Sequence, residues 1–425
     1  MVVLRSVLGM MVLLLIAFVA STNRKLIRPR TVIAALLSQI AIGAFVLFVP
    51  LGKDILGGAA NAVNQVLNYG NSGIAFLFGG LVSAKMFEIF GNTGFVFAFR
   101  VLPAIIFVTS LISVLYYIGV MKWVVLILGT VFQKAIGVTK IESFSAASTI
   151  FLGQSEMPAM VKPFIKRMTG SELFAVMSSG MASVAGSVLA GYAGLGVKME
   201  YLLAASFMAI PGGLLFAKII CPTTEESAVE FKHVDFDEHR PANIIDAAAS
   251  GVTVGLQIAF NVGAMLIAFI GLIALADGIV GGICGWFGHP QWTLEYLLGV
   301  MFSPLAWLIG VPWNHAQIAG NFLGQKMILN EFVAYANLSP YLKGAASVTT
   351  AGLQVLDPRT LAILSFALCG FANFSSIAIL IGGFSAVDQE RRSEVTRYGV
   401  RVVIAGTLSN LMSATIAGIF LSLHG

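Results

Sequence analysis

The chain has 425 residues, of which 58% are hydrophobic and only 11% are charged, and its mean hydropathy is +0.91. A soluble domain carries about 25% charged residues, so this composition excludes a soluble globular protein and indicates a multi-pass membrane protein. The net charge of +5 is therefore interpreted as a mark of membrane topology and not of nucleic-acid binding. Three single cysteines lack the spacing of a metal or disulfide site and are expected to be small buried side chains: Cys221, Cys284 and Cys369.

Eight apolar segments are long enough to cross a bilayer as a helix, which takes about 20 residues. They are 2–20, 32–49, 99–120, 173–196, 200–220, 250–276, 360–386 and 399–423. Basic residues follow the first segment and recur in later loops, whereas 277–295 contains no lysine or arginine. Because basic loops face the cytoplasm, both termini are expected outside the cytoplasmic membrane. The polar stretch 222–249 is expected to be a cytoplasmic loop, and the spacing of its His233 and His239 fits no metal-ligand pattern.

Two further segments, 121–167 and 296–341, interrupt this pattern. In each, two short apolar helices are separated by a break, at Gly153-Gln154 in the first and at Asn330-Glu331 in the second. Each arm is too short to cross a membrane, and irregular backbone at membrane depth is tolerated only where protein buries it or where it lines a cavity. The sequence therefore predicts two re-entrant hairpins.

A glutamate lies at the tip of each predicted hairpin, Glu156 in the first and Glu331 in the second. A carboxylate at membrane depth costs several kcal/mol unless it is paired or faces a wet cavity, so both are candidate functional residues. Similar helices rich in glycine, alanine and serine follow the two hairpins, which start on opposite sides of the membrane. This pattern is typical of an inverted-repeat secondary transporter with its binding site at the midplane.

The polar groups near the two tips include amides, hydroxyls and carboxylates but no lysine or arginine. They belong to Gln154, Ser155, Glu156, Asn330, Glu331, Asn373, Ser375 and Ser376. Together with the aromatic faces of Phe371 and Phe374, this set suits a neutral, hydroxyl-rich solute with a flat face rather than a phosphate or a dicarboxylate. Ser375 could instead pack between helices, and Phe374 could contact lipid or the core.

Three motifs carry a family resemblance. Residues 324–334 match the motif G-x-K-x-x-x-N-E-F-V-A of a transporter family. The segments 153–156 and 370–376 match two more motifs of that family, and the three follow one another along the chain in the family's order. The chain resembles the concentrative nucleoside transporters, in their bacterial branch, from end to end. The resemblance implies an all-α integral membrane protein with eight transmembrane helices, two opposed re-entrant hairpins, an inverted repeat, and scaffold and elevator-type transport domains. It also implies a homotrimer among membrane lipids, with no enzymatic activity or cofactor, that takes up nucleosides such as uridine on an inward cation gradient.

The resemblance also assigns domains and site residues. The scaffold comprises 1–120 and 250–277, and the transport domain comprises a first repeat at 121–221 and a second at 278–425. The base of the nucleoside is expected to face three residues of the first tip and to pack on two apolar side chains, and the ribose to bind three other residues. The base set is Gln154, Ser155, Glu156, Val188 and Phe371, and the ribose set is Glu331, Asn373 and Ser376.

Sodium ligands would be the hydroxyls of Thr149 and Ser183 and the backbone carbonyls of Leu152 and Val184. Sodium-coupled members of the family carry asparagine where this chain has Thr149, which leaves a proton as the alternative coupling ion, carried by Glu156 or Glu331. Sodium is preferred here. His315 stands where relatives carry an acidic residue and is either proton-linked or a partly exposed side chain of the hairpin arm.

Other functional classes fit less well. A channel needs a continuous polar stripe on several helices, whereas the polar groups here are concentrated at breaks. An intramembrane enzyme needs a nucleophile with its base or a metal cluster, and the sequence contains neither HExxH nor GxSxG. A transporter of another neutral, hydroxyl-rich solute is the alternative that the sequence leaves open.

Overall fold

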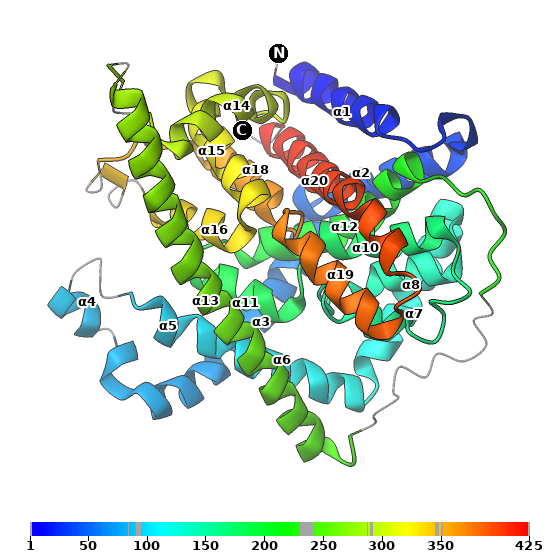
Figure 1. Ribbon diagram of the computed structural model, residues 1–425. Coiled ribbons are helices and arrows are strands. Elements are labelled where there is room, and N and C mark those ends of the chain that lie inside the picture. Colours follow the sequence, from blue (N-terminus) through cyan, green and yellow to red (C-terminus); the bar gives the residue numbers. More distant parts are fainter. Residues whose placement is uncertain are drawn as a thin grey trace.

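The computed structural model describes residues 2–83, 85–90, 95–229, 241–286, 288–289, 292–344, 348–349 and 352–423. Every regular element within these ranges is a helix (Figure 1). The first half of the chain forms α1 (Val2–Val19), η1 (Arg24–Leu26), α2 (Pro29–Leu47), α3 (Pro50–Phe78), η2 (Gly79–Val82), α4 (Lys85–Phe90), α5 (Phe97–Arg100), α6 (Leu102–Tyr117), α7 (Val120–Phe132), η4 (Gln133–Gly137), α8 (Lys140–Ser148), α9 (Met157–Val161), α10 (Gly170–Ala182), α11 (Gly186–Gly194) and α12 (Met199–Ile220). The second half forms α13 (Ile244–Gly285), α14 (Leu294–Leu308), α15 (Trp313–Ile328), α16 (Glu331–Leu342), α18 (Pro358–Leu368), α19 (Ser375–Val387) and α20 (Arg392–Ser422).

The core of the molecule lies around α12 and α20, which pack against each other and are largely buried. Around them lie α10, α18, α1 and α2. Close approach of three helices is possible because Gly212 of α12 has no side chain: a Cβ there would lie 2.6 Å from Nε2 of Gln39 in α2. The same Gln39 amide donates a hydrogen bond of 2.9 Å to Ser413 in α20. Small residues with a buried polar bond are a common way to join helices within a membrane.

The outer part of the molecule includes α13, a helix of 42 residues that crosses the front of the bundle in Figure 1. It packs along α6, and most of its remaining apolar surface is exposed. Glycines bring the two helices together, because a Cβ on Gly251 would lie 2.6 Å from the Cα of Ser110, and one on Gly255 would lie 2.8 Å from the Cα of Ile106. The exposed apolar side chains are those expected of a helix that faces lipid.

Seven helical segments among the described residues are long and apolar enough to cross a membrane, and an eighth is reached if α14 and α15, bent by 115°, count as one span. Two of the predicted crossings are each divided: 173–196 overlaps α10 and α11, and 360–386 overlaps α18 and α19. The sequence did not predict α3, which carries several asparagines among its apolar residues. His233 and His239 lie outside the described residues.

The three cysteines are all free. Cys221 and Cys369 are buried, as expected, but Cys284 near the end of α13 is partly exposed, so the prediction of burial is wrong for that residue.

Both predicted hairpins are present. The first consists of α8 and α9, joined by the tip 149–156, and the second consists of α15 and α16, joined by Leu329 and Asn330. In the second tip, the side chain of Asn330 caps α16 by accepting a hydrogen bond of 2.9 Å from the backbone N–H of Val333. Such a cap satisfies one of the free donors at a helix start. The second tip has two residues between its helices, whereas the first has eight.

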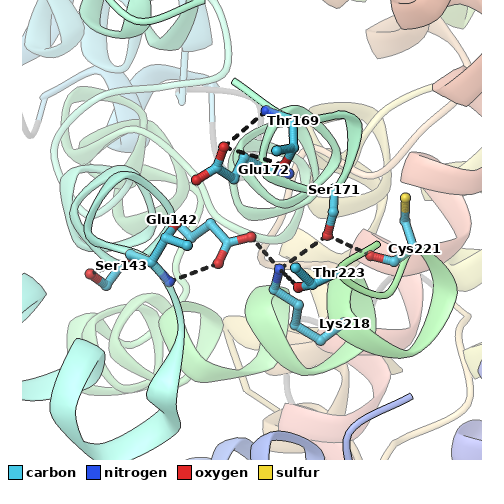
Figure 2. Close-up of polar contacts among 9 residues, drawn as sticks. Glu142, Ser143, Thr169, Ser171, Glu172, Lys218, Cys221 and Thr223 are labelled. Carbon is cyan, nitrogen blue, oxygen red and sulfur yellow. Dashed lines mark hydrogen bonds and ion pairs between the residues drawn. The ribbon is translucent and has the colours of Figure 1, made fainter. Parts of the chain in front are cut away.

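A buried ion pair fixes the base of the first hairpin (Figure 2). The ammonium of Lys218, near the end of α12, pairs with the carboxylate of Glu142 in α8. It also donates to the hydroxyls of Ser171 at 3.1 Å and Thr223 at 3.0 Å. Removing one partner of a buried ion pair typically costs about 3–5 kcal/mol, so this cluster holds the first arm of the hairpin against α12.

A different polar contact fixes the base of the second hairpin. Nδ1 of His315 in α15 lies 2.9 Å from Oδ2 of Asp357, which also caps α18 by accepting from the N–H of Thr360 at 2.8 Å. His315 is 8% exposed, so the interpretation of this residue as partly exposed is wrong. Burial alone would raise the pKa of Asp357, but hydrogen bonds from Thr360 and His315 outweigh it and lower the pKa.

Candidate substrate site

A cavity of about 390 Å³ lies between the two hairpin tips, α13 and the two helix breaks. The breaks are residues 183–185, between α10 and α11, and 369–374, between α18 and α19. All eight residues that the sequence predicted for the substrate line it: Gln154, Ser155, Glu156, Val188, Glu331, Phe371, Asn373 and Ser376. No lysine or arginine is found among the described residues that line this cavity. The site therefore combines carboxylates, amides, hydroxyls and apolar faces, as the sequence indicated.

The carboxylate of Glu331, at the start of α16, is held in place by two neighbours. Its Oε1 accepts from the hydroxyl of Tyr192 at 3.1 Å, and its Oε2 accepts from Nδ2 of Asn373 at 3.0 Å. The other end of the Asn373 amide accepts from the backbone N–H of Ser376 at 2.9 Å. The carboxylate is thus oriented by hydrogen bonds while it retains acceptor positions for a ligand.

The first tip reaches the same place through Gln154, whose Nε2 donates to the hydroxyl of Ser376 at 2.7 Å. In the turn itself, the backbone N–H of Gly153 donates to the carboxylate of Glu156. Two polar atoms of residues that line the cavity, Oε1 of Gln154 and Nδ2 of Asn330, have no hydrogen-bond partner among the described residues. Both atoms are almost wholly shielded from solvent, and a buried polar group without a partner is destabilising.

The cavity wall formed by α13 was not predicted from the sequence. Five of its residues line the cavity: Ile258, Asn261, Val262, Ala264 and Met265. Asn261, a polar residue in a long apolar helix, is the feature that could have marked this wall. The cavity is also lined by Asn330 and Ser375, and Tyr192 contacts it indirectly through its hydrogen bond to Glu331. Phe374 is 47% exposed and is not among the residues that line the cavity.

The four predicted cation ligands lie on two neighbouring segments. The hydroxyl of Thr149 donates to the carbonyl of Ala146 at 2.6 Å, and the hydroxyl of Ser183 donates to the carbonyl of Ser179 at 3.0 Å, so both hydroxyl oxygens can still accept or coordinate. The carbonyl of Phe151, next to Leu152, accepts from the backbone N–H of Gly186 at 3.2 Å and joins the first tip to the break at 183–185 between α10 and α11. Oxygen ligands of this kind suit a hard cation. No cluster of three or more His, Cys, Asp or Glu residues that could bind a metal occurs in the described part of the chain.

Family models match along the length of the chain. Residues 8–81 match the model described as Na+ dependent nucleoside transporter N-terminus, residues 98–199 match nucleoside recognition, and residues 201–418 match Na+ dependent nucleoside transporter C-terminus. The chain belongs to the concentrative nucleoside transporter family. The family predicted from the three motifs is thereby confirmed, and with it a transporter rather than an enzyme.

Named relatives and solved structures agree with this assignment. The chain is 55% identical to a putative nucleoside permease, NupX, of Escherichia coli, with 99% of each chain covered. It is 47% identical to the nucleoside permease NupC of Helicobacter pylori over 99% of this chain and 98% of that protein. The structure of CNTnw in an inward-facing substrate-bound state is 57% identical and covers 100% of this chain and 99% of the other, with a TM-score of 0.94. The predicted all-α membrane fold with re-entrant hairpins is thereby confirmed, and eight transmembrane helices fit it.

Proposed function

We propose that this nucleoside transporter is a symporter that takes up nucleosides across the cytoplasmic membrane and binds them in the cavity between the hairpin tips. One observation carries the proposal: two carboxylates, several amides and hydroxyls and an aromatic face converge on one cavity, with no basic side chain among its described lining residues. A neutral solute with several hydroxyls and a flat ring matches these groups. Family membership supports nucleosides as the substrate class.

The ribose would bind at the second tip. The carboxylate of Glu331 accepts from vicinal hydroxyls, which makes charge-assisted hydrogen bonds of the stronger kind. Asn373 and Ser376 complete this half of the site, which Asn330 also lines. Tyr192, which is not among the described lining residues, donates to this carboxylate and orients it.

The base would bind at the first tip, with uridine as a representative substrate. Its polar edge faces Gln154, Ser155 and Glu156, which line the cavity at the first tip. Val188 and Phe371 pack on the ring, and aromatic contact of this kind tolerates different bases.

Sodium is the proposed coupling ion, bound by Thr149, Leu152, Ser183 and Val184. The adjacency of the two segments supports this choice, and so does the family description as Na+ dependent. Proton coupling through Glu156 or Glu331 is the alternative, because a buried carboxylate can carry a proton. A transporter of another neutral, hydroxyl-rich solute is the second alternative.

Uptake of labelled uridine into proteoliposomes tests the proposal, with sodium and pH gradients imposed separately. We expect saturable uptake driven by the inward sodium gradient and competed by other nucleosides but not by free bases. Uptake driven only by the pH gradient would establish the proton alternative, and no saturable uridine uptake under either gradient would contradict the proposed function.

The proposed working unit is a homotrimer with both termini outside the cytoplasmic membrane. Residues 1–120 and 250–277 would form the scaffold, and the two repeats, 121–221 and 278–425, would move together as the transport domain. The position of the cavity supports this division, because α13 forms one wall and the hairpins and breaks form the rest.

A further inference from the structure

Lys326, in the last turn of α15, is a buried lysine that forms no ion pair with a carboxylate of the described residues. Its side chain is 3% exposed, and its Nζ donates to the carbonyl of Ala367 at 2.7 Å and to Oδ1 of Asn410 at 2.7 Å. In the described part of the chain, no carboxylate lies within ion-pair distance of it, whereas the buried Lys218 pairs with Glu142 (Figure 2). A buried ammonium is costly unless its surroundings compensate the charge.

Part of the compensation comes from the electrostatic attraction of Glu331, and part comes from the end of α18. The last carbonyls of a helix lack partners within the helix and carry a partial negative charge. At this helix end, side chains from three other helices supply the donors. The backbone carbonyl of Ser365 accepts from the hydroxyl of Tyr335 at 2.6 Å, and that of Ala367 accepts from the ammonium of Lys326 at 2.7 Å. The carbonyl of Cys369 accepts from the amide of Asn410 at 2.9 Å. Lys326 is thus the cation at the negative end of an interrupted helix.

Asn410, in the middle of α20, connects this helix end to the corresponding one in the first repeat. Its Nδ2 donates to the carbonyl of Ala182 at the end of α10 and to the carbonyl of Cys369 just after α18. Both N–H groups of the amide are therefore used, which orients Oδ1 toward Lys326. A Cβ on Gly370 would collide with the Asn410 side chain, so the glycine is required for this contact.

The carboxyl-terminal ends of α10 and α18 differ, because a lysine contacts the end of α18 but not the end of α10. The end of α10 receives amide N–H groups, from Asn410 to Ala182 and from the backbone of Phe371 to the carbonyl of Ser183 at 3.1 Å. Among the described contacts, no ammonium or guanidinium reaches it. This is the helix end that carries Ser183 and Val184, the proposed cation ligands. The coupling cation would therefore neutralise the negative end of α10 in the first repeat, as the ammonium of Lys326 neutralises the negative end of α18 in the second.

We propose that the ammonium of Lys326 is a fixed cation that positions the second tip, as the counterpart of the coupling cation at the first tip. This inference rests on the proposed function. Lys326 ties the first arm of hairpin 2 to α18 and α20 permanently, which keeps Glu331 and Asn373 in place for the ribose whether or not a coupling cation is bound. Only the first repeat then needs an ion from solution.

Calorimetric titration of the purified full-length transporter with uridine, in saturating sodium, tests this role. Lys326→Gln keeps a donor and removes the charge, and we expect its affinity to fall roughly tenfold or more. Lys326→Ala leaves a space, and we expect added ammonium or methylammonium to restore binding severalfold in this variant but not to change wild type. Lys166→Ala, an exposed lysine, is the matched control and should bind like wild type with or without ammonium.

Wild-type affinity in Lys326→Gln, or no response of Lys326→Ala to either amine, would overturn the inference. Thermal unfolding is read on the same samples: a variant that loses its fold supports the proposal only if the amines restore it, and contradicts it if they do not. A wild-type protein that binds no uridine would instead refute the proposed function, so the two failures are distinguishable.

Discussion

The two hairpin tips perform similar reversals of the chain in different ways. The first tip runs through residues 149–156, with Ser155 exposed and Glu156 partly exposed. The second reverses through Leu329 and Asn330, and both Asn330 and Glu331 are buried. A capped, buried tip is more rigid than a longer, partly exposed one. In the proposed arrangement the second tip binds the ribose, which is common to all nucleosides, and the first binds the base, which varies. The two tips would then be a fixed half and an adaptable half of one site.

The largest expected effect comes from Glu331→Gln. The substitution keeps the shape but removes the charge, and hydrogen bonds to a charged group contribute about 1.5–3 kcal/mol each. We therefore expect uridine affinity to fall roughly 10- to 100-fold or more, with little change in folding. Titration calorimetry measures the affinity, and Glu225→Gln, an exposed glutamate, is the control. A wild-type affinity in Glu331→Gln would show that the fixed half does not bind the substrate.

Glu156→Gln is expected to have a smaller effect that depends on the base. The first tip is more exposed, and an amide can still bond to a base edge, so the loss should be severalfold and differ between uridine and adenosine. Competition binding with both nucleosides measures it. An equal loss for the two would argue against a base-facing role for this tip.

Thr149→Asn tests the coupling ion at the first tip. An amide carbonyl is a stronger ligand for a hard cation than a hydroxyl, so the sodium concentration needed for half-maximal uridine uptake should decrease severalfold. Uptake by proteoliposomes at varied sodium concentration measures this. An unchanged sodium dependence would remove Thr149 from the proposed cation site.

The smallest expected effect concerns Asp357→Asn at the base of the second hairpin. The change keeps a capping oxygen but removes a charge at the start of α18, which is worth about 0.3–1 kcal/mol. Because the pKa of Asp357 is lowered in the folded protein, its charge stabilises the fold above the pKa of the unfolded carboxyl, about 3.9. The stabilisation disappears as pH falls through the lowered pKa.

Thermal unfolding of wild type and Asp357→Asn across pH values measures this contribution. The difference between the two should be constant near neutral pH and shrink below about pH 4. A difference that grows on acidification would contradict the assigned direction of the pKa shift.

The hairpins and the tip residues could be predicted because a break or a carboxylate in apolar sequence has few structural explanations. Glu156 and Glu331 stand out for this reason, whereas the role of Asn373 was predicted from the family motif, and all three residues line the cavity. The extent of each helix was less predictable, since an apolar run does not show where its backbone is interrupted. The break after Ala182 depends on contacts with Asn410 and Phe371, which come from distant parts of the chain.

The sequence could not indicate which helix would close the cavity. Met265 and Val262 of α13 resemble any lipid-facing residue until the packing of the helix is known. Lys326 belongs to a recognised motif, but its partners are a carbonyl and an amide far along the chain. The burial of His315 likewise depends on Asp357, which lies 42 residues away in sequence.

The division of one nucleoside between two tips is tested most directly by a cycle of binding measurements. Uridine and 3′-deoxyuridine are titrated into wild type and into Glu331→Gln. We expect wild type to prefer uridine roughly tenfold or more. Glu331→Gln should lose most of this preference, because the missing hydroxyl and the missing charge belong to one interaction. An unchanged preference in the variant would show that Glu331 does not bind the ribose.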